Sequence, residues 1–222
     1  MLDMEWLTTR QKLFEKFCLP SVLSQTNKNF EWLIVSDSRT PESFKTILNT
    51  YPAKILYYDF TGKIPARGTK HQRAVALETA IVPPLQEYIS SVATDYVMTS
   101  RLDNDDAISK NHIDQIQQFA VPKGRYWLNV QRGYKWCSGN VYPIGALFNP
   151  FISFIEPQGT LLTAYQCSHK LAYKTKYPVE QIRQGHPTWM QTIHGSNLCN
   201  KLMRYRGEAP YSAVSNIFTI GA

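Results

Sequence analysis

The segment Asp95-Tyr-Val-Met-Thr-Ser-Arg-Leu-Asp-Asn-Asp-Asp-Ala-Ile108 decides how this chain folds. Its apolar residues 96–98 do not alternate with polar ones, which predicts a buried strand rather than a half-exposed one. The strand is followed by three carboxyl groups, those of Asp103, Asp105 and Asp106. In open α/β sheets, ligands bind at the edge where the strands end, so we expect a binding site here.

A helix is predicted directly after these acids. Ser109 is a suitable N-cap, and the residues at helical spacing after it are His112, Ile113, Ile116 and Phe119. The three carboxyl groups therefore lie between a strand and a helix, close enough to repel one another. A divalent cation between them would relieve that repulsion. Hard oxygen ligands suit Mg²⁺ or Mn²⁺, which commonly bridge to the phosphates of a substrate.

The chain before this segment alternates between helical and extended patterns. Apolar spacing predicts helices at residues 6–17, 40–48 and 70–81 and strands at residues 30–37 and 53–59. Thr40 is the expected cap of the second helix, with Pro41 in its first turn. Pro83 and Pro84 are expected to break or restart the third. Helices that alternate with short apolar strands predict an α/β layer architecture.

The pattern changes after Phe119. Residues 126–136 are aromatic and extended, residues 142–154 contain Pro and Gly, and residues 178–182 are predicted to form a late helix. We therefore expect one domain whose second half is irregular or built on a mixed sheet.

Composition limits the class of protein. The 222 residues are most simply one domain with a substantial core. No apolar run is long enough to span a membrane, and no secretory signal is recognisable, so we expect a cytoplasmic protein. The four cysteines form no CxxC pair, which favours reduced thiols over a zinc site. The net charge of +7 favours anionic partners such as a nucleotide diphosphate, an acidic glycan, nucleic acid or, peripherally, a membrane surface.

The order of these features resembles a known family. Asp37 ends one predicted strand, a basic segment begins a helix, and Arg101-Leu-Asp-Asn-Asp-Asp106 ends another strand. This is similar to the inverting, family-2-like glycosyltransferases of the GT-A fold, which carry a Leu-Asp-x-Asp-Asp version of the Asp-x-Asp motif. More narrowly, the chain resembles the bacterial rhamnosyltransferase family. The segments that carry this resemblance are Leu13-Phe-Glu15, Leu19-Pro-Ser21, Gln25-Thr26, Phe30-Glu-Trp32, Arg101 to Ala107 and Trp189 through Asn197.

The resemblance implies a fold and an activity. The fold would be a GT-A-like, Rossmann-type mixed sheet flanked by helices. Family members usually have an earlier strand before the first helix, and we expect the sheet of this chain to lack it. The activity would be metal-dependent transfer of a sugar, rhamnose by the family's name, from a nucleotide diphosphate donor to a saccharide or glycan acceptor, with inversion. Residues 1–119 would bind the nucleotide sugar, and residues 120–222 the acceptor.

The resemblance also implies metal ligands. Asp105 would be the direct ligand of Mn²⁺ or Mg²⁺, and Asp103 would bind the ribose or reach the metal through water. A late histidine, His194, would complete the coordination or touch the diphosphate, since a neutral imidazole is a competent Mn²⁺ ligand. Structural alternatives stay open, namely an acidic helix-capping turn for the acids and a turn-capping role for His194. A calcium loop of the EF-hand type does not fit, because Ala107 and Ile108 stand where an acid and Gly are needed.

Donor binding is expected from basic residues and one further acid. Asp37 would contact the base or ribose, although Asp is also common in turns at strand ends. Arg67, Lys70 and Arg73 lie at the start of a predicted helix, where the helix dipole and side-chain charge both attract phosphate. Their alternative is a solvated basic face. Arg101 would bind the diphosphate or hold Asp103 in place.

An inverting transfer needs a base for the proton of the acceptor hydroxyl. Glu156, in the acceptor half, is the candidate, with His169 and Asp114 as alternatives. For Glu156 the competing interpretation is a solvated loop acid.

Two other classes of function remain open. In the first, a basic aromatic surface binds nucleic acid or glycan without chemistry, as single-stranded nucleic acid favours such surfaces. Clustered acids would repel a phosphate backbone, and no nucleic-acid-binding motif is present, so no nucleic-acid partner is expected. In the second, the chain is a nucleotidyltransferase, for which we find no Gly-rich nucleotide loop.

Overall fold

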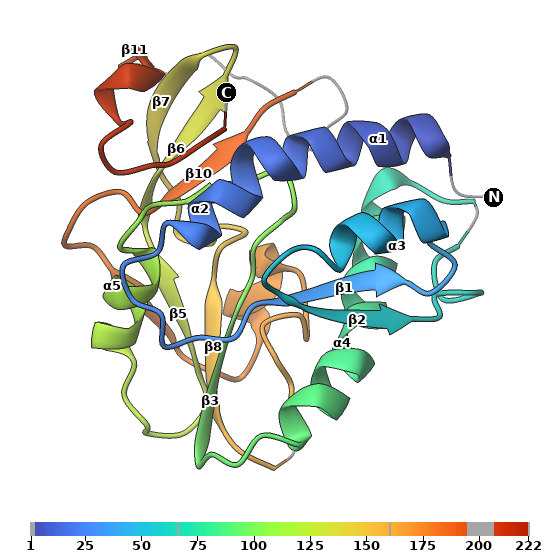
Figure 1. The fold of residues 1–222 in the computed structure, drawn as a ribbon. Helices are drawn as coiled ribbons and strands as arrows, with labels where there is room; N and C mark the ends of the chain where they lie inside the picture. The colour runs from blue at the N-terminus through green and yellow to red at the C-terminus, as the bar shows by residue number, and fades with distance from the viewer. Residues whose placement is uncertain (1–2, 66, 160, 195–206, 222) are drawn as a thin grey trace.

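The computed structural model describes residues 3–65, 67–159, 161–194 and 207–221 (Figure 1). The helices are α1 (Met4–Leu13), α2 (Leu19–Leu23), α3 (Glu42–Leu48), α4 (Lys70–Ser90) and α5 (His112–Phe119). A π-helical segment, η1 (Phe14–Cys18), joins α1 to α2, and two 3₁₀ segments follow later, η2 (His169–Lys174) and η3 (Tyr211–Ala213). Within these residues no helix is long and apolar enough to cross a membrane.

The strands form three sheets. A parallel pair contains β1 (Leu33–Asp37) and β2 (Lys54–Tyr58). The second sheet has the order β3 (Tyr96–Ser100), β8 (Ser153–Pro157), β5 (Tyr126–Val130) and β9 (Val179–Ile182). The third has the order β11 (Ala209–Pro210), β7 (Asn140–Gly145), β6 (Arg132–Cys137), β10 (Trp189–Thr192) and β4 (Ala107–Ile108).

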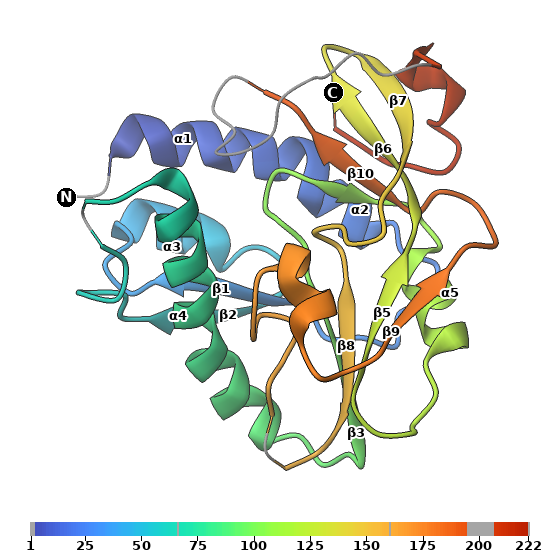
Figure 2. The same ribbon diagram turned by 180° about the vertical axis from the view of Figure 1, so that it is seen from behind.

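The mixed α/β architecture confirms the predicted class, but one continuous sheet is not formed by the described residues. The pair β1–β2 lies beside α3 and α4 and is not hydrogen-bonded to β3 (Figures 1 and 2). The predicted strand at β3 is confirmed, whereas its full burial is wrong, since its residues are half-buried and Ser100 is exposed. Because β3 pairs within the described chain only with β8, one of its edges has no strand beside it.

Two sequence-based predictions of secondary structure need correction. Residues 179–182, predicted as a late helix, form strand β9, because they pair in parallel with β5. Helix α4 continues through Pro83 and Pro84, and its later residues Leu85 and Ile89 are buried in a cluster that includes Leu161. Burial of that apolar side outweighs the backbone hydrogen bonds that the two prolines remove.

Two predicted helix caps also differ. Helix α3 begins at Glu42 with Pro41 as N-cap, and the hydroxyl of Thr40 instead contacts that of Ser36 at 3.1 Å. Helix α5 begins later than predicted, with Asn111 as N-cap, because β4 comes between the acidic residues and the helix. The hydroxyl of Ser109, two residues earlier, donates to Asn111 Oδ1 at 2.8 Å and so supports the turn that begins the helix.

Strand β10 is anchored in the core by Trp189, which is fully buried. Its indole N–H donates to the carbonyl of Val130 at 2.7 Å, and its ring stacks on Phe151 with centroids 5.2 Å apart. The indole lies against Gly133 of β6. A Cβ atom at this position would collide with three atoms of the indole ring. A residue without a side chain is therefore needed there.

Replacing Gly133 by Ala is expected to lower the free energy of unfolding by about 1–3 kcal/mol or more, since the indole and the strand must move apart. Chemical denaturation followed by circular dichroism measures this. Gly145→Ala is the matched control in the same sheet, because its Cβ would meet only the Gln131 carbonyl, at 4.0 Å. Equal stability of the two variants would contradict this packing.

Candidate functional site

The acidic segment lies where β3 ends and turns into β4. The turn is closed by the amide of Asp106, which donates to the carbonyl of Asp103 at 3.1 Å. Strand β4 then pairs antiparallel with β10, with Ala107 opposite Met190. Continuing this register places Thr192 beside Asp105, and β10 thus carries its last residues to the acids. Segments almost ninety residues apart in sequence meet at this point.

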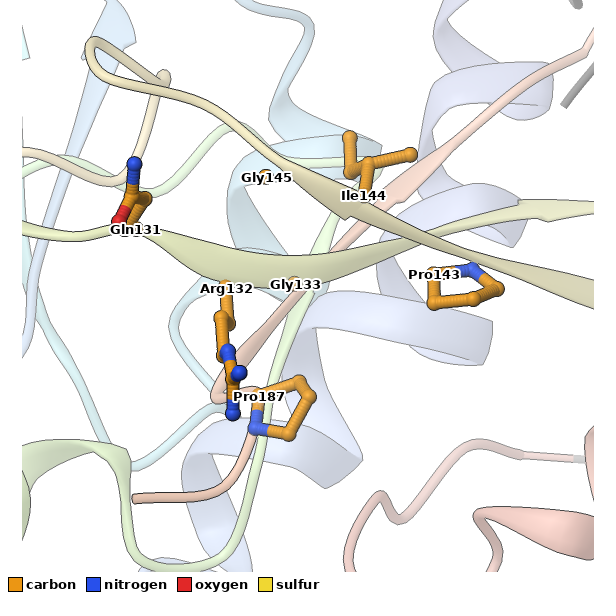
Figure 3. Close-up of a pocket in the computed structure, with 7 residues that line it drawn as sticks. All are labelled: Gln131, Arg132, Gly133, Pro143, Ile144, Gly145 and Pro187. Atoms are coloured by element: carbon orange, nitrogen blue, oxygen red, sulfur yellow. The ribbon is translucent and has the colours of Figure 1, made fainter. Parts of the chain in front are cut away.

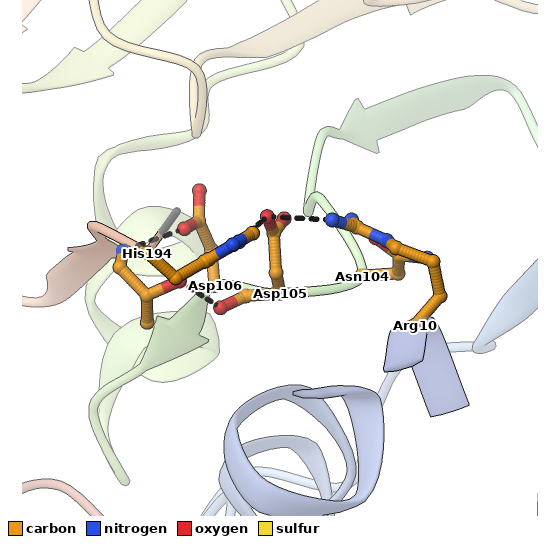
Figure 4. A network of polar contacts seen from close by, with 6 residues as sticks. Arg10, Asn104, Asp105, Asp106 and His194 are labelled. Atoms are coloured by element: carbon orange, nitrogen blue, oxygen red, sulfur yellow. Dashed lines mark hydrogen bonds and ion pairs between the residues drawn. The ribbon is translucent and has the colours of Figure 1, made fainter. Parts of the chain in front are cut away.

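Asp105 lies at the centre of the contacts (Figure 4). Its Oδ2 is 2.8 Å from His194 Nε2 and 3.1 Å from Arg10 Nη1, which approach from opposite sides. The second guanidinium nitrogen of Arg10 donates to the side chain of Asn104. The carbonyl of Asp105 accepts from the hydroxyl of Thr192 at 2.5 Å. Helix α1, the acidic turn and the end of β10 are thereby joined through one residue.

Asp106 faces inward. It is 2 % exposed, and its Oδ1 accepts from the amide of Thr192 at 2.8 Å. Burial, followed by the charges of Asp105 and Asp103, raises the pKa of Asp106 well above its ordinary value. Burial, followed by the charges of Asp106, Asp105 and Asp103, also raises the pKa of the Cys18 thiol, which keeps that thiol protonated. The inward carboxyl is thus a structural part of the cluster.

Asp103 is exposed, while its neighbour Arg101 is buried. The Arg101 guanidinium donates to Glu78 Oε1 on α4 at 2.6 Å and to the carbonyl of Cys167 at 3.4 Å. It also lies over the ring of Tyr165, 4.7 Å from its centroid. Of the two roles predicted for Arg101, these contacts favour the structural one, because the side chain ties the end of β3 to α4 and to the loop before η2.

Two of the side-chain atoms in this cluster are suitably placed to bind one cation together. Asp105 Oδ2 and His194 Nε2 are 2.8 Å apart, close to the separation of about 2.9 Å between adjacent ligands in an octahedral Mg²⁺ site. Among the residues that the structure describes, no third His, Cys, Asp or Glu joins them. Mg²⁺ commonly binds through one or two protein groups together with substrate phosphates, so two donors fit a diphosphate-bridging ion better than an all-protein cage.

The predicted donor-binding residues lie apart from this cluster. Asp37 ends β1, as predicted, and its carboxylate accepts from the Arg39 side chain at 2.6 Å and 2.9 Å. The hydrogen bonds from Arg39 lower the pKa of Asp37, so it is a carboxylate at neutral pH. Arg67 and Arg73 are exposed beside the start of α4, whose N-cap Thr69 forms a capping box with Gln72.

Lys70 is the first residue of α4, but its side chain lies outside the described part of the structure. Helix α4 nevertheless links this basic start to the acids. Glu78, two turns further along the same helix, pairs with Arg101 next to Asp103. Lys70 and Arg73 are therefore on the helix that supports the acidic turn through Glu78, and Arg67 lies just before that helix.

Glu156 is not the exposed loop acid that its competing interpretation assumed. It lies within β8 opposite Val97 and is fully buried. Its two oxygens each accept one backbone amide at 2.8 Å, from Leu162 and Thr163, and Arg125 lies 3.6 Å away. This enclosure argues against access by an acceptor hydroxyl and favours a role in holding the loop after β8.

The two alternative bases are also placed by the structure. Asp114 lies on α5, where its carboxylate accepts from Gln118 at 2.8 Å, as expected of a helix-surface residue. His169 begins η2, and burial, together with the charges of Arg101 and Lys170, lowers its pKa to about 3. A pKa this low makes the imidazole a weak base.

A surface pocket lies away from the acidic cluster. It has a volume of about 430 Å³, and its lining comes from β6, β7 and the adjoining residues 131 and 187 (Figure 3). Figure 3 shows Arg132 and Pro187 close together beside this hairpin. None of the lining residues belongs to the acidic cluster, so this pocket is separate from the predicted donor site.

Sequence reasoning missed three residues of the site. Arg10, Glu78 and Thr192 contact the cluster or its supporting arginine from α1, α4 and β10. Their only local signals are an arginine on the apolar side of the first helix and an acid within a basic helix. Neither pattern says which distant residue is the partner.

Glu156→Ala is expected to lower the free energy of unfolding by at least about 2 kcal/mol, because two buried amides lose their acceptor. Urea denaturation measures the loss. Glu180→Ala is the control, since Glu180 forms an exposed pair with Lys123 and its removal should cost under about 1 kcal/mol. Full stability of Glu156→Ala combined with loss of sugar transfer would instead support the catalytic-base prediction.

A comparison with models of protein families identifies the family of this chain. The model of the family described as "Putative rhamnosyl transferase" matches residues 1–206, which include every residue of the acidic cluster and His194. A comparison with curated proteins gave no match. Since the family model covers most of its length, the chain belongs to the putative rhamnosyl transferase family.

Proposed function

We propose that this protein is a metal-dependent glycosyltransferase that moves a sugar, rhamnose by the family's description, from a nucleotide diphosphate donor to a saccharide acceptor with inversion. Family membership supports transfer of a sugar between a donor and an acceptor. The metal ion and the nucleotide diphosphate donor are proposed from one observation. Asp105 and His194 converge at the end of β3, and the exposed Asp103 lies next to them.

In this proposal each part of the cluster has a distinct task. Asp105 and His194 hold the cation, Mn²⁺ or Mg²⁺, which neutralises charge on the departing nucleoside diphosphate. Asp103 faces the donor's ribose. Arg101 and Glu78 keep the acidic turn at a fixed distance from α4, so that the ligands do not have to be ordered when the donor binds.

The basic start of α4 supplies the remaining recognition of the donor. The exposed side chains of Arg67 and Arg73 flank a helix N-terminus, where backbone amides and the helix dipole favour phosphate. Asp37 is held as a carboxylate by Arg39 and is suited to accept hydrogen bonds from ribose or base hydroxyl and amino groups. The acceptor would enter from the side of residues 120–222.

Titration calorimetry with UDP, GDP and dTDP tests this proposal. We expect micromolar binding of one nucleotide in the presence of Mn²⁺, at least about tenfold weaker binding with EDTA, and the same loss in Asp105→Ala or His194→Ala. Asp114→Ala is the control, because that acid lies on the surface of α5. Nucleotide binding that survives both EDTA and Asp105→Ala would contradict the metal site. Failure of all three nucleotides to bind would favour a non-catalytic binding module.

A further inference from the structure

Arg10 occupies an unusual position for a residue of an exposed helix. Helix α1 contains no buried residue, and its Met4 and Trp6 are each 51 % exposed. The Arg10 side chain, in contrast, is 17 % exposed and reaches the acidic turn, where it contacts Asp105 and Asn104 (Figure 4). Its Nε is buried and has no hydrogen-bond partner among the described residues. The guanidinium is therefore held by the acids rather than by its own helix.

The contact with Asp105 uses the oxygen that a cation would need. Oδ2 receives Arg10 Nη1 at 3.1 Å and His194 Nε2 at 2.8 Å. When His194 donates a hydrogen bond to Oδ2, its Nε2 carries a proton, whereas a metal-bound Nε2 must present its lone pair. A divalent cation at this oxygen would also repel the guanidinium at nearly contact distance. Arg10 and a divalent cation are alternative partners of Asp105.

The segment after α1 is held in the core independently of the contact between Arg10 and Asp105. The π-helical segment η1 follows α1 directly, and its Phe17 and Cys18 are buried beside β4. These anchors fix the C-terminal end of the helical stretch, while α1 itself contacts the acidic turn through Arg10 and the core through Leu13, its last residue. π-helical turns frequently occur at functional sites within helices. Loss of the Arg10–Asp105 pair would therefore free the part of α1 before Leu13 without unpacking the core.

We propose that Arg10 is a built-in counter-cation of the acidic cluster, which a divalent cation displaces from Asp105, and that α1 is released from the cluster when this occurs. This inference rests on the proposed function, because it assumes that Asp105 and His194 bind a cation. It adds Arg10 to the site. It also means that binding of a cation weakens the attachment of α1 to the acidic cluster, and the reverse.

Mn²⁺ titration followed by electron paramagnetic resonance of the free ion tests the competition without requiring turnover. Arg10→Gln is expected to bind Mn²⁺ about tenfold more tightly than the natural chain, because the competing charge is gone. Arg10→Lys, which keeps a charge, should remain within about threefold. Lys12→Gln is the matched control, since it removes one charge from an exposed position of the same helix. Asp105→Ala should abolish the binding in every background.

Hydrogen exchange of the α1 amides measures the second half of the inference. In the natural chain, saturating Mn²⁺ should accelerate exchange in residues 4–13, and Arg10→Gln should show fast exchange there without Mn²⁺. Circular dichroism melting would verify that the variant is folded. If it is not, the effect of saturating Mn²⁺ on the natural chain still tests the release of α1, and unchanged exchange in residues 4–13 would overturn it.

The outcomes separate two failures. Unchanged or weaker Mn²⁺ affinity in Arg10→Gln would overturn the competition but leave the metal site standing. Absence of Asp105-dependent Mn²⁺ binding in all variants would overturn the competition and the metal-dependent part of the proposed function together.

Discussion

The mutual repulsion of three carboxyl groups within four residues is the constraint on which the arrangement of this chain depends. Asp103, Asp105 and Asp106 follow one strand so closely that they cannot all be charged side by side without compensation. Each of the three carboxyl groups has a different environment. Asp103 stays exposed, Asp105 contacts Arg10 and His194, and Asp106 is buried with a raised pKa and a backbone amide on its carboxyl oxygen.

This compensation also explains why distant elements meet here. Arginines from α1 and from the end of β3, an acid from α4 and the last residues of β10 all converge on the acidic turn. A buried ion pair contributes little net stability once desolvation is counted, but removal of one partner is costly. The pair of Arg101 with Glu78 thus fixes position more than it adds stability. Placement of these groups before a donor arrives is what a transferase site requires.

Local patterns in the sequence predicted the elements that carry the site, and long-range pairing decided the rest. The strand at residues 96–100, the acids after it and the helical start at Lys70 are all set by short-range periodicity and turn chemistry. The local pattern of residues 178–182 indicated a helix and was misleading, because a four-residue parallel strand is defined by its partner β5. Glu156 shows the same limit, since its burial depends on the loop that it binds. Arg10 could not be identified, because nothing near it specifies Asp105.

We propose above all that the donor's diphosphate and its cation bind at the end of β3. Diffraction from crystals grown with Mn²⁺ and the nucleoside diphosphate that binds best, collected at the manganese absorption edge, tests this claim most directly. The predicted result is one anomalous peak within bonding distance of Asp105 and His194, with the diphosphate beside it. A diphosphate bound elsewhere, or a peak away from both side chains, would contradict the account.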